Sequence, residues 1–380
     1  MLYDICLMLG IIAILGEVLL IFSWIGRRWR YRKERITSYL PEAHIIVPCK
    51  GTTKNFRENI QAICNQDYRD YKIVFVTDSA KDPAYKELKE IISNYPTARI
   101  EISDFIDGCS GKISALIKGV KTADDIDVYV FADSDIRPHK NWLRYLVSYL
   151  KEDEIGATTG YRWYFPHDLT SLLLSTWNST CISSLFSHRV NFTWGGSTAI
   201  SKKLFDELNI ANKWRRALSD DLILSKAVKD AGYKIKFVPE CIVESYGEES
   251  IRKFMKWGTR QFTMIRWYYP SLWLMSFIIV TGLKFLNFLG LFLLLIGFTL
   301  PGVLLISTIF LDMIVGWQRH ITFKKIMCYP KEKFGSTLAY IGITPIVYFL
   351  IAYNIISSLL KNEIEWGGRR YQKPGTSKRG

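Results

Sequence analysis

The most informative chemical motif in this 380-residue chain is Asp133-Ser134-Asp135, which directly follows the apolar run 128–132. Two carboxylates at this spacing can hold a divalent cation such as Mg²⁺ or Mn²⁺ against a diphosphate, because these ions prefer carboxylate and phosphate oxygens. The ion would neutralise the charge that develops on a departing nucleotide diphosphate. A solvated turn is the ordinary alternative for Asp and Ser, but the position directly after a strand-like run favours the metal site.

A second carboxylate, Asp78, directly follows the strand-like run 71–77. At the end of a strand such a group can accept hydrogen bonds from the base or the ribose of a nucleotide. Asp82 lies nearby and precedes Pro83, a pair that is typical of the start of a helix. We therefore expect Asp82 to cap a helix and Asp78 to bind the nucleotide.

A third acidic site, Asp220-Asp221, follows Ser219 and precedes the amphipathic stretch 222–239. One of these aspartates could cap the helix that this stretch predicts. The other could act as the general base that takes the proton of an acceptor hydroxyl. The residues alone do not distinguish the cap from the base.

The segments around these aspartates alternate between strands and helices. Strands are predicted over 44–48, 71–77, 98–102 and 128–132, and helices over 55–65, 83–94 and 112–122. This alternation predicts an α/β fold with a mostly parallel sheet covered by helices on both faces. Ligands of such sheets bind beyond the carboxyl ends of the strands, where Asp78 and Asp133 lie.

Apolar segments at both ends of the chain predict an integral membrane protein. Residues 5–25 are long enough to cross a bilayer, and Glu17 is the one charge within them. The basic cluster 27–33 follows this run, which predicts an uncleaved anchor with everything downstream on the cytoplasmic side. Near the other end, 271–317 and 336–360 predict two or three further spans. The basic segments 318–335 and 361–380 leave the side of the tail open.

Composition supports a membrane location. Hydrophobic residues make up 49% of the chain and aromatic residues 14%, yet the net charge is +14. The basic residues flank apolar stretches instead of lining one polar face, which favours an anionic membrane surface over nucleic acid. The predicted parts are an anchor, a catalytic domain, an interfacial helix, a transmembrane region and a basic tail (1–26, 41–250, 251–270, 271–360 and 361–380).

The stretch 252–267 interleaves basic and aromatic residues. It predicts an amphipathic helix at the membrane surface, and it could also hold a diphosphate with its cations. The residues concerned are Lys253, Lys256, Trp257 and Arg260.

Taken together, these motifs resemble the membrane branch of the inverting glycosyltransferases with the GT-A fold, and most closely the ceramide glucosyltransferase family. The similarity extends over some 230 residues. The similar segments are Pro48-Cys-Lys50-Gly51, Asp78 within VTDSAKDPA, Lys112-Ile-Ser-Ala-Leu, Asp133-Ser-Asp-Ile-Arg137, and Asp221 followed by Lys226-Ala227, Asp230 and Gly232.

The chain departs from the family at its last signature, Q/R-x-x-R-W. The best fit is Lys253-Phe-Met-Lys256-Trp257, and a second candidate is Thr263-Met-Ile-Arg266-Trp267. We choose Trp257 because its distance from Asp221 is close to that in the family. Lysine is a point charge that cannot hold a diphosphate bidentately as arginine does, so the departure concerns the clamp and not the class of reaction.

The resemblance implies a GT-A domain on the cytoplasmic face that moves a hexose, glucose from UDP-glucose, to a lipid hydroxyl such as that of ceramide. It implies Asp221 as the base of a single inverting displacement, and Asp133 and Asp135 as ligands of Mn²⁺ or Mg²⁺. It further implies that the nucleotide-sugar donor is bound by Lys50, Asp78, Lys112 and Asp133. The segment 171–197, with Trp194, Gly195 and Gly196, would shape the lipid entrance, and we interpret 171–187 as an interfacial helix.

Two other functions compete with this prediction. A processive polysaccharide synthase of the same superfamily would share the aspartates but needs a membrane channel, which three or four spans of one copy hardly provide. A membrane scaffold would need neither a metal pair nor a base, so the complete set of aspartates argues against it.

Overall fold

A computed structural model describes residues 1–380 except 31–36, 54, 124–125, 247–249 and 374–380. The chain divides into two compact units. The helical unit comprises 1–33, 165–183 and 249–364, and the sheet unit comprises 34–164, 184–248 and 365–380. Each unit is therefore assembled from segments that are far apart in the sequence.

The sheet unit is built on an eight-stranded sheet with the order β3-β2-β1-β4-β7-β6-β8-β5. The first four strands in this order are parallel, and β7 inserts between β4 and β6 antiparallel to both. β8 runs parallel to β6, and β5 closes the edge antiparallel to β8. The strands are β1 (Ala43–Cys49), β2 (Tyr71–Thr77), β3 (Ala98–Ile102), β4 (Val128–Ala132), β5 (Ile136–Arg137), β6 (Ile155–Trp163), β7 (Ser197–Ser201) and β8 (Lys234–Ser245).

The predicted mostly parallel sheet with flanking helices is confirmed. β2, β3 and β4 have the predicted bounds, and β1 is one residue longer at each end. Every residue of β4 is buried, as are most of β1 and β2, because helices cover both faces of a parallel sheet. The predicted helices are α2 (Phe56–Cys64), α3 (Pro83–Ile92) and α4 (Gly111–Lys121).

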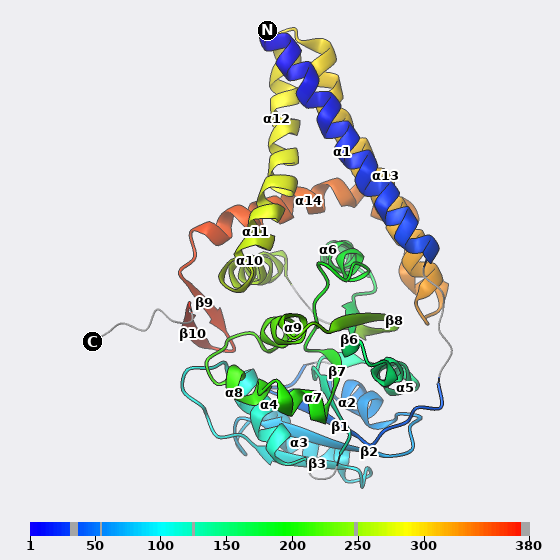
Figure 1. The fold of residues 1–380 in the computed structure, drawn as a ribbon, viewed down its shortest axis with the longest axis vertical. Coiled ribbons are helices and arrows are strands. Elements are labelled where there is room, and N and C mark those ends of the chain that lie inside the picture. The colour runs from blue at the N-terminus through cyan, green and yellow to red at the C-terminus, as the bar shows by residue number, and fades with distance from the viewer. Residues whose placement is uncertain (31–36, 54, 124–125, 247–249, 374–380) are drawn as a thin grey trace, which may run out of the picture. The chain divides into compact units, whose positions relative to one another are not determined.

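One face of the sheet carries four helices with a shared core: α4, α7 (Lys202–Glu207), α8 (Ile210–Trp214) and α9 (Asp220–Asp230). Figure 1 shows them in green and cyan beside the strands. The Trp214 ring packs edge to face on both Phe131 and Phe205, with centroids 5.3 Å apart for each contact. This packing fixes α8 and the start of α9 against the end of β4.

The helical unit contains four helices that are long and apolar enough to cross a membrane, counted over the described residues: 2–26, 270–295, 299–326 and 331–359. They correspond to α1 (Leu2–Arg30), α11 (Pro270–Ser276) with α12 (Gly282–Leu295), α13 (Thr299–Ile326) and α14 (Thr337–Leu359). Between α11 and α12 the helix has a π-helical turn over Phe277–Thr281. The chain turns between α12 and α13 at Gly297, whose φ is +86°. The other helices of the unit are α6 (Leu169–Leu185) and α10 (Ile251–Tyr268).

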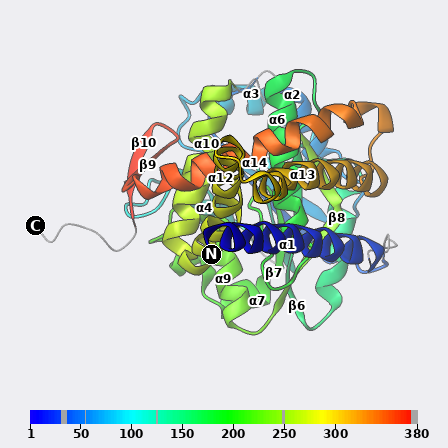
Figure 2. The same cartoon turned by 90° about the horizontal axis from the view of Figure 1, so that it is seen from above.

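Within this unit, α1 runs beside α13 in the same direction. Tyr3 packs edge to face on Phe298 near one end, and Trp24 packs on Phe323 near the other. α12 and α13 form an antiparallel hairpin that carries a buried ion pair, Lys284–Asp312. α14 instead runs crosswise to α12 (Figures 1 and 2).

The structure describes only part of the predicted N-terminal anchor and its basic flank. Residues 27–30 of the basic cluster 27–33 are the last residues of α1, and residues 31–33 and the side chains of 27–30 are outside the described part. Glu17 is 7% exposed and is buried within the helical unit.

After α14 the chain forms a short hairpin, β9 (Glu363–Trp366) and β10 (Arg369–Gln372). In the sheet unit, the guanidinium of Arg369 lies 4.1 Å from the centre of the Phe105 ring. The hydroxyl of Tyr371 accepts a hydrogen bond from the backbone N–H of Gly111 at 3.3 Å. The C-terminal segment therefore rejoins the sheet unit at the start of α4.

Candidate active site

The carboxyl ends of β1 and β2 bring Lys50 and Asp78 together. These strands are parallel neighbours with Cys49 opposite Thr77, so the next residue of each strand lies at the same edge. The ammonium of Lys50 lies 2.8 Å from Asp78 Oδ2. Asp82 caps α3, as predicted, because its Oδ1 accepts hydrogen bonds from the N–H groups of Ala84 and Gly51.

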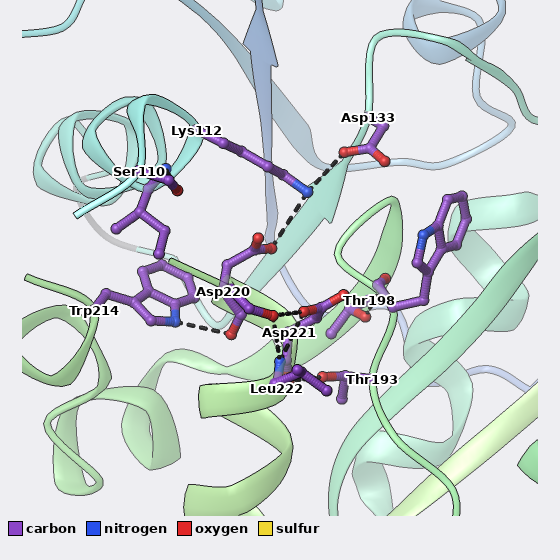
Figure 3. Close-up of polar contacts among 12 residues, drawn as sticks. Ser110, Lys112, Asp133, Thr193, Thr198, Trp214, Asp220, Asp221 and Leu222 are labelled. Carbon is purple, nitrogen blue, oxygen red and sulfur yellow. Dashed lines mark hydrogen bonds and ion pairs between the residues drawn. The ribbon is translucent and has the colours of Figure 1, made fainter. Parts of the chain in front are cut away.

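A second group of charges gathers around Lys112 at the start of α4 (Figure 3). The Lys112 ammonium lies 2.8 Å from Asp133 Oδ1 and 3.4 Å from Asp220 Oδ2. Ser110 caps α4 by accepting a hydrogen bond from the N–H of Ile113, which fixes the turn that carries the lysine. The structure thus joins α4, the end of β4 and the start of α9 through one ammonium group.

Asp220 and Asp221 have different environments. Asp220 is 4% exposed and faces Lys112, whereas Asp221 is only partly buried. Asp221 Oδ1 accepts hydrogen bonds from Ser219 Oγ and from the N–H of Leu222. The N-cap of α9 is Ser219, so the cap that we expected from one of the aspartates belongs to their neighbour.

The backbone at this turn is held from two sides. Trp214 Nε1 donates to the carbonyl oxygen of Asp220 at 3.0 Å, and Thr193 Oγ1 donates to that of Asp221 at 3.0 Å. The buried indole and the hydroxyl therefore keep both carboxylates in place. A rigid mounting of this kind is what a catalytic carboxylate needs.

Burial and charge act against each other in this group. Burial by itself raises the pKa of Asp133, but Lys112 and Arg162 hold it below its usual value. Burial is also the largest effect on Asp220, and with the charges of Asp221 and Asp133 it raises that pKa to about 6 despite Lys112. Burial alone would lower the pKa of Lys112, but the surrounding carboxylates raise it above its usual value.

Arg162, on β6, is part of this site, although none of the motifs in the sequence includes it. Its two terminal nitrogens lie 3.0 Å from Asp133 Oδ2 and 3.4 Å from Asp135 Oδ2. The only signal in the sequence is a cation within the strand-like run Gly160-Tyr-Arg-Trp163, and nothing there indicates which residues it meets.

The Asp133/Asp135 pair fits a divalent cation. Asp135 Oδ1 is buried and has no hydrogen-bond partner among the described residues, so one carboxylate oxygen is left for a ligand. Among the residues that the structure describes, no three His, Cys, Asp or Glu side chains are grouped so that they could hold a metal ion. An ion at this pair would therefore need further oxygens, which a diphosphate supplies.

The segment Trp194-Gly195-Gly196 lies against these charges. A Cβ on Gly195 would collide with the Asp220 carboxylate and the Lys112 ammonium, and one on Gly196 with Asp133 Oδ2 and the Trp194 ring. The Arg162 guanidinium lies 4.8 Å from the centre of that ring. The structure thus brings the predicted acceptor segment to the predicted donor residues within the sheet unit.

The predicted clamp residues all lie on α10, in the helical unit. Lys253 and Lys256 are exposed, Arg260 and Trp257 are partly buried, and the Trp257 ring packs edge to face on Trp177 of α6. In the second candidate motif, Arg266 instead donates to the carbonyl oxygens of Leu359 and Lys361 at the end of α14.

Comparisons with known proteins agree with this architecture. The model of Glycosyl transferase family 21 matches residues 7–376. A probable glycosyltransferase, YdaM of Bacillus subtilis (strain 168), is 25% identical over 245 residues, which is 61% of this chain and 56% of that protein. Ceramide glucosyltransferase 3 of Caenorhabditis elegans is 21% identical over 241 residues, 59% of this chain and 50% of that one. The chain thus spans about half the length of these relatives.

Among solved structures, the mannosyltransferase PcManGT from Pyrobaculum calidifontis, determined in complex with GDP-Man and Mn²⁺, superposes with a TM-score of 0.56. The match covers 95% of this chain and 98% of that one at 15% identity, so it bears on the fold alone. The sheet and this match confirm the predicted GT-A fold. Because the family model extends over nearly the whole sequence, the chain belongs to glycosyl transferase family 21, the ceramide glucosyltransferase family predicted from its motifs.

Proposed function

We propose that this chain is a membrane-bound inverting glycosyltransferase that moves glucose from UDP-glucose to a lipid hydroxyl such as that of ceramide. One observation carries the proposal. At the carboxyl edge of the sheet, Lys112 joins Asp133 and Asp220, and the partly exposed carboxylate of Asp221 stands next to them in the chain. Sugar transfer from a nucleotide requires a cation, a pair of metal ligands and an accessible base. In this proposal these are Lys112, the Asp133/Asp135 pair and Asp221.

The donor would lie along the ends of β1, β2 and β4. Asp78, held by Lys50, has an oxygen that can accept a hydrogen bond from the base or the ribose. Lys112 is kept protonated by its carboxylate neighbours and can face the diphosphate. Asp133 and Asp135 would hold Mn²⁺ or Mg²⁺, and when bound the ion neutralises charge on the leaving diphosphate.

Asp221 is the base in this proposal. The acceptor hydroxyl oxygen forms a bond to the anomeric carbon while the bond from that carbon to the diphosphate breaks. The hydroxyl proton passes to the Asp221 carboxylate, and the nucleoside diphosphate leaves with the bonding electron pair. One displacement inverts the configuration at the anomeric carbon. Asp220 suits this role less well, because it is buried and paired with Lys112.

The resemblance to the ceramide glucosyltransferase family assigns the remaining contacts. Trp194, Gly195 and Gly196 would line the sugar end of the acceptor path, and the cations of α10 would meet the leaving group. Lys256 is exposed and available for this contact, whereas Arg266 is already bound to backbone carbonyls. This difference supports Trp257 over Trp267 as the tryptophan of the last motif.

The proposed membrane topology places the sheet unit and the tail on the cytoplasmic side. The chain leaves the sheet unit before residue 249 and rejoins it at residue 365, with three candidate spans between. An odd number of crossings would separate Arg369 and Tyr371 from their partners in the sheet unit. We therefore count two crossings, α12 and α13, and assign α14, which runs crosswise to α12, to the membrane surface.

This topology agrees with the distribution of charge. Both basic segments, 318–335 and 361–380, then lie on the cytoplasmic side together with the cluster 27–33. Protease protection of terminal tags in inside-out vesicles tests it. A C-terminal tag should be cleaved and an N-terminal tag protected, and protection of the C-terminal tag would contradict the assignment of α14.

The activity is tested with full-length protein in detergent, a panel of radiolabelled UDP-sugars and a panel of lipid acceptors, with and without Mn²⁺ or Mg²⁺. We expect a lipid-extractable product with one added sugar. Polymer retained at the origin of a thin-layer plate would instead indicate a processive synthase. Absence of turnover with every donor would indicate a scaffold.

A further inference from the structure

The Arg162 side chain occupies both carboxylates of the Asp133/Asp135 pair at once. One terminal nitrogen lies 3.0 Å from Asp133 Oδ2, and the other lies 3.4 Å from Asp135 Oδ2. Lys112 engages the other oxygen of Asp133 at 2.8 Å. Three of the four carboxylate oxygens thus face a protein cation, and only Asp135 Oδ1 is without a partner among the described residues.

The guanidinium is held in this position by its surroundings. The side chain is 14% exposed, donates to the Tyr164 hydroxyl at 3.1 Å and lies over the Trp194 ring. Arginine suits such a site because its planar fork reaches two acceptors at once and is less strongly hydrated than an ammonium group. Arg162 is therefore a built-in positive charge at the pair that the proposed function gives to a metal ion.

Charge balance indicates what this arrangement does. Asp133, Asp135 and Asp220 supply three negative charges in this group, and Lys112 and Arg162 supply two positive ones. A divalent cation arriving alone would meet carboxylates that are already largely neutralised. A cation arriving with a diphosphate would bring compensating negative charge, and a guanidinium displaced from the carboxylates can bind that diphosphate.

The geometry points to Arg162 as a positioning residue that competes with the divalent cation for Asp133 and Asp135, so that metal and donor bind together and metal alone binds weakly. This inference rests on the cation of the proposed function. It goes beyond that function by assigning control of metal loading to a residue on β6, outside the aspartate motif.

Binding of Mn²⁺ to the full-length protein in detergent tests the competition without any turnover. Free Mn²⁺ is measured by electron paramagnetic resonance during titration of the protein, first alone and then with saturating UDP. We expect wild-type protein to bind Mn²⁺ weakly alone and at least about tenfold more tightly with UDP. Arg162→Gln removes the competing charge, so the affinity for Mn²⁺ alone should rise about tenfold or more, and the effect of UDP should shrink.

Arg137→Gln is the matched control. Arg137 lies two residues beyond the motif, carries the same charge and is also partly buried, but its contacts are Asn59, Glu58 and the Tyr246 ring. Its replacement should leave the affinity for Mn²⁺ alone within about twofold of wild type. An equal rise in both variants would overturn the inference, because it would reflect only the loss of nearby positive charge.

Arg162→Lys keeps a positive charge for folding, which matters if the glutamine variant does not fold. A lysine ammonium cannot span two carboxylates, so this variant should bind Mn²⁺ alone more tightly than wild type and less tightly than the glutamine variant. If neither variant exceeds wild type, Arg162 does not compete with the ion. If Mn²⁺ binds none of the proteins even with UDP, both the competition and the proposed metal requirement are wrong. If Mn²⁺ binds wild type and Arg162→Gln equally tightly, only the competition is wrong.

Discussion

The ammonium of Lys112 lies 2.8 Å from the Asp133 carboxylate, although the lysine is in the first turn of a helix and the aspartate directly follows a strand. The same ammonium reaches Asp220 at 3.4 Å, so it links two acidic motifs that are far apart in the sequence. This link decides which of the two neighbouring aspartates is turned inward. Asp220 is committed to the lysine, and Asp221 is left at the more accessible position.

Replacement of the base should separate chemistry from binding. Asp221→Asn keeps the size of the side chain and an oxygen that can accept from Leu222 N–H, but it removes the proton acceptor. We expect transfer to fall by about 10²- to 10⁴-fold, with UDP affinity within about twofold of wild type. Single-turnover assays and calorimetric titration with UDP measure the two quantities.

Asp220→Asn is the matched control for that variant. It removes one of the two carboxylates that hold Lys112, so UDP affinity should change together with the rate. If Asp221→Asn keeps full activity, Asp221 is not the base. If instead only Asp220→Asn loses transfer while it still binds UDP, the base is Asp220.

The sequence was sufficient to predict the first half of the sheet. The strands β1, β2 and β4 are apolar runs because both of their faces are covered, and each is followed directly by a charged residue at the open edge. The helix starts at Asp82 and near Ser219 followed from local capping chemistry. Local patterns were enough because these features depend on residues close in the sequence.

The second half of the site depends on contacts between distant segments. In the sheet, β7 lies between β4 and β6, and Arg162 of β6 still contacts Asp133 after β4. The sequence pattern of residues 155–163 indicates neither feature. The choice of Ser219 over the aspartates as the cap also depends on a distant partner, because Lys112 draws Asp220 inward. The return of Arg369 and Tyr371 to the sheet unit could not be predicted from a basic tail.

The pH dependence of stability tests the environment of Asp220. Its pKa in the folded protein is about 6, above the usual 3.8, so its contribution to stability is fully present below about pH 3.8 and is lost as the pH rises through about 6. This loss corresponds to about 3 kcal/mol at about 1.4 kcal/mol per pH unit. The melting temperature of wild type relative to Asp220→Asn should therefore fall between pH 4 and pH 7.

The measurement uses thermal unfolding in detergent with EDTA present, so that bound metal does not contribute. Asp133, Asp135 and Lys112 are present in both proteins, and the difference between the two profiles isolates position 220. A difference that stays constant over this range would show that the Asp220 carboxyl titrates near its usual pH.

Asp78 and Asp82 are separated by four positions, and we expect replacement of Asp78 to weaken UDP binding and replacement of Asp82 to leave it nearly unchanged. Asp78→Asn removes the charge that pairs with Lys50 at the end of β2, and we expect UDP affinity to fall about tenfold. Asp82→Asn retains an oxygen for the N–H groups of Ala84 and Gly51, and asparagine caps helices about as well as aspartate. Titration with UDP in the absence of metal compares them, and equal losses would assign the nucleotide contact to both residues.

Lys256 and Arg266 distinguish the two candidate positions of the last motif. Lys256→Gln should raise the KM for the UDP-sugar about tenfold and leave the melting temperature nearly unchanged, because the side chain is exposed. Arg266→Gln removes hydrogen bonds to the carbonyl oxygens of Leu359 and Lys361, so it should lower the melting temperature instead. The reverse pattern would make Trp267 the tryptophan of the motif.

Gly195→Ala tests whether the Trp194-Gly195-Gly196 segment must lie directly against the charges of the site. A Cβ at this position would meet the Asp220 carboxylate and the Lys112 ammonium, so the segment or the ion pair has to move. We expect at least a tenfold loss of transfer and weaker UDP binding, because Lys112 is displaced from its position at the site. Gly111→Ala is the control, since its Cβ would make only an ordinary contact with the Arg369 side chain at 3.5 Å. Wild-type kinetics in Gly195→Ala would show that the segment can withdraw from the cluster without affecting the donor.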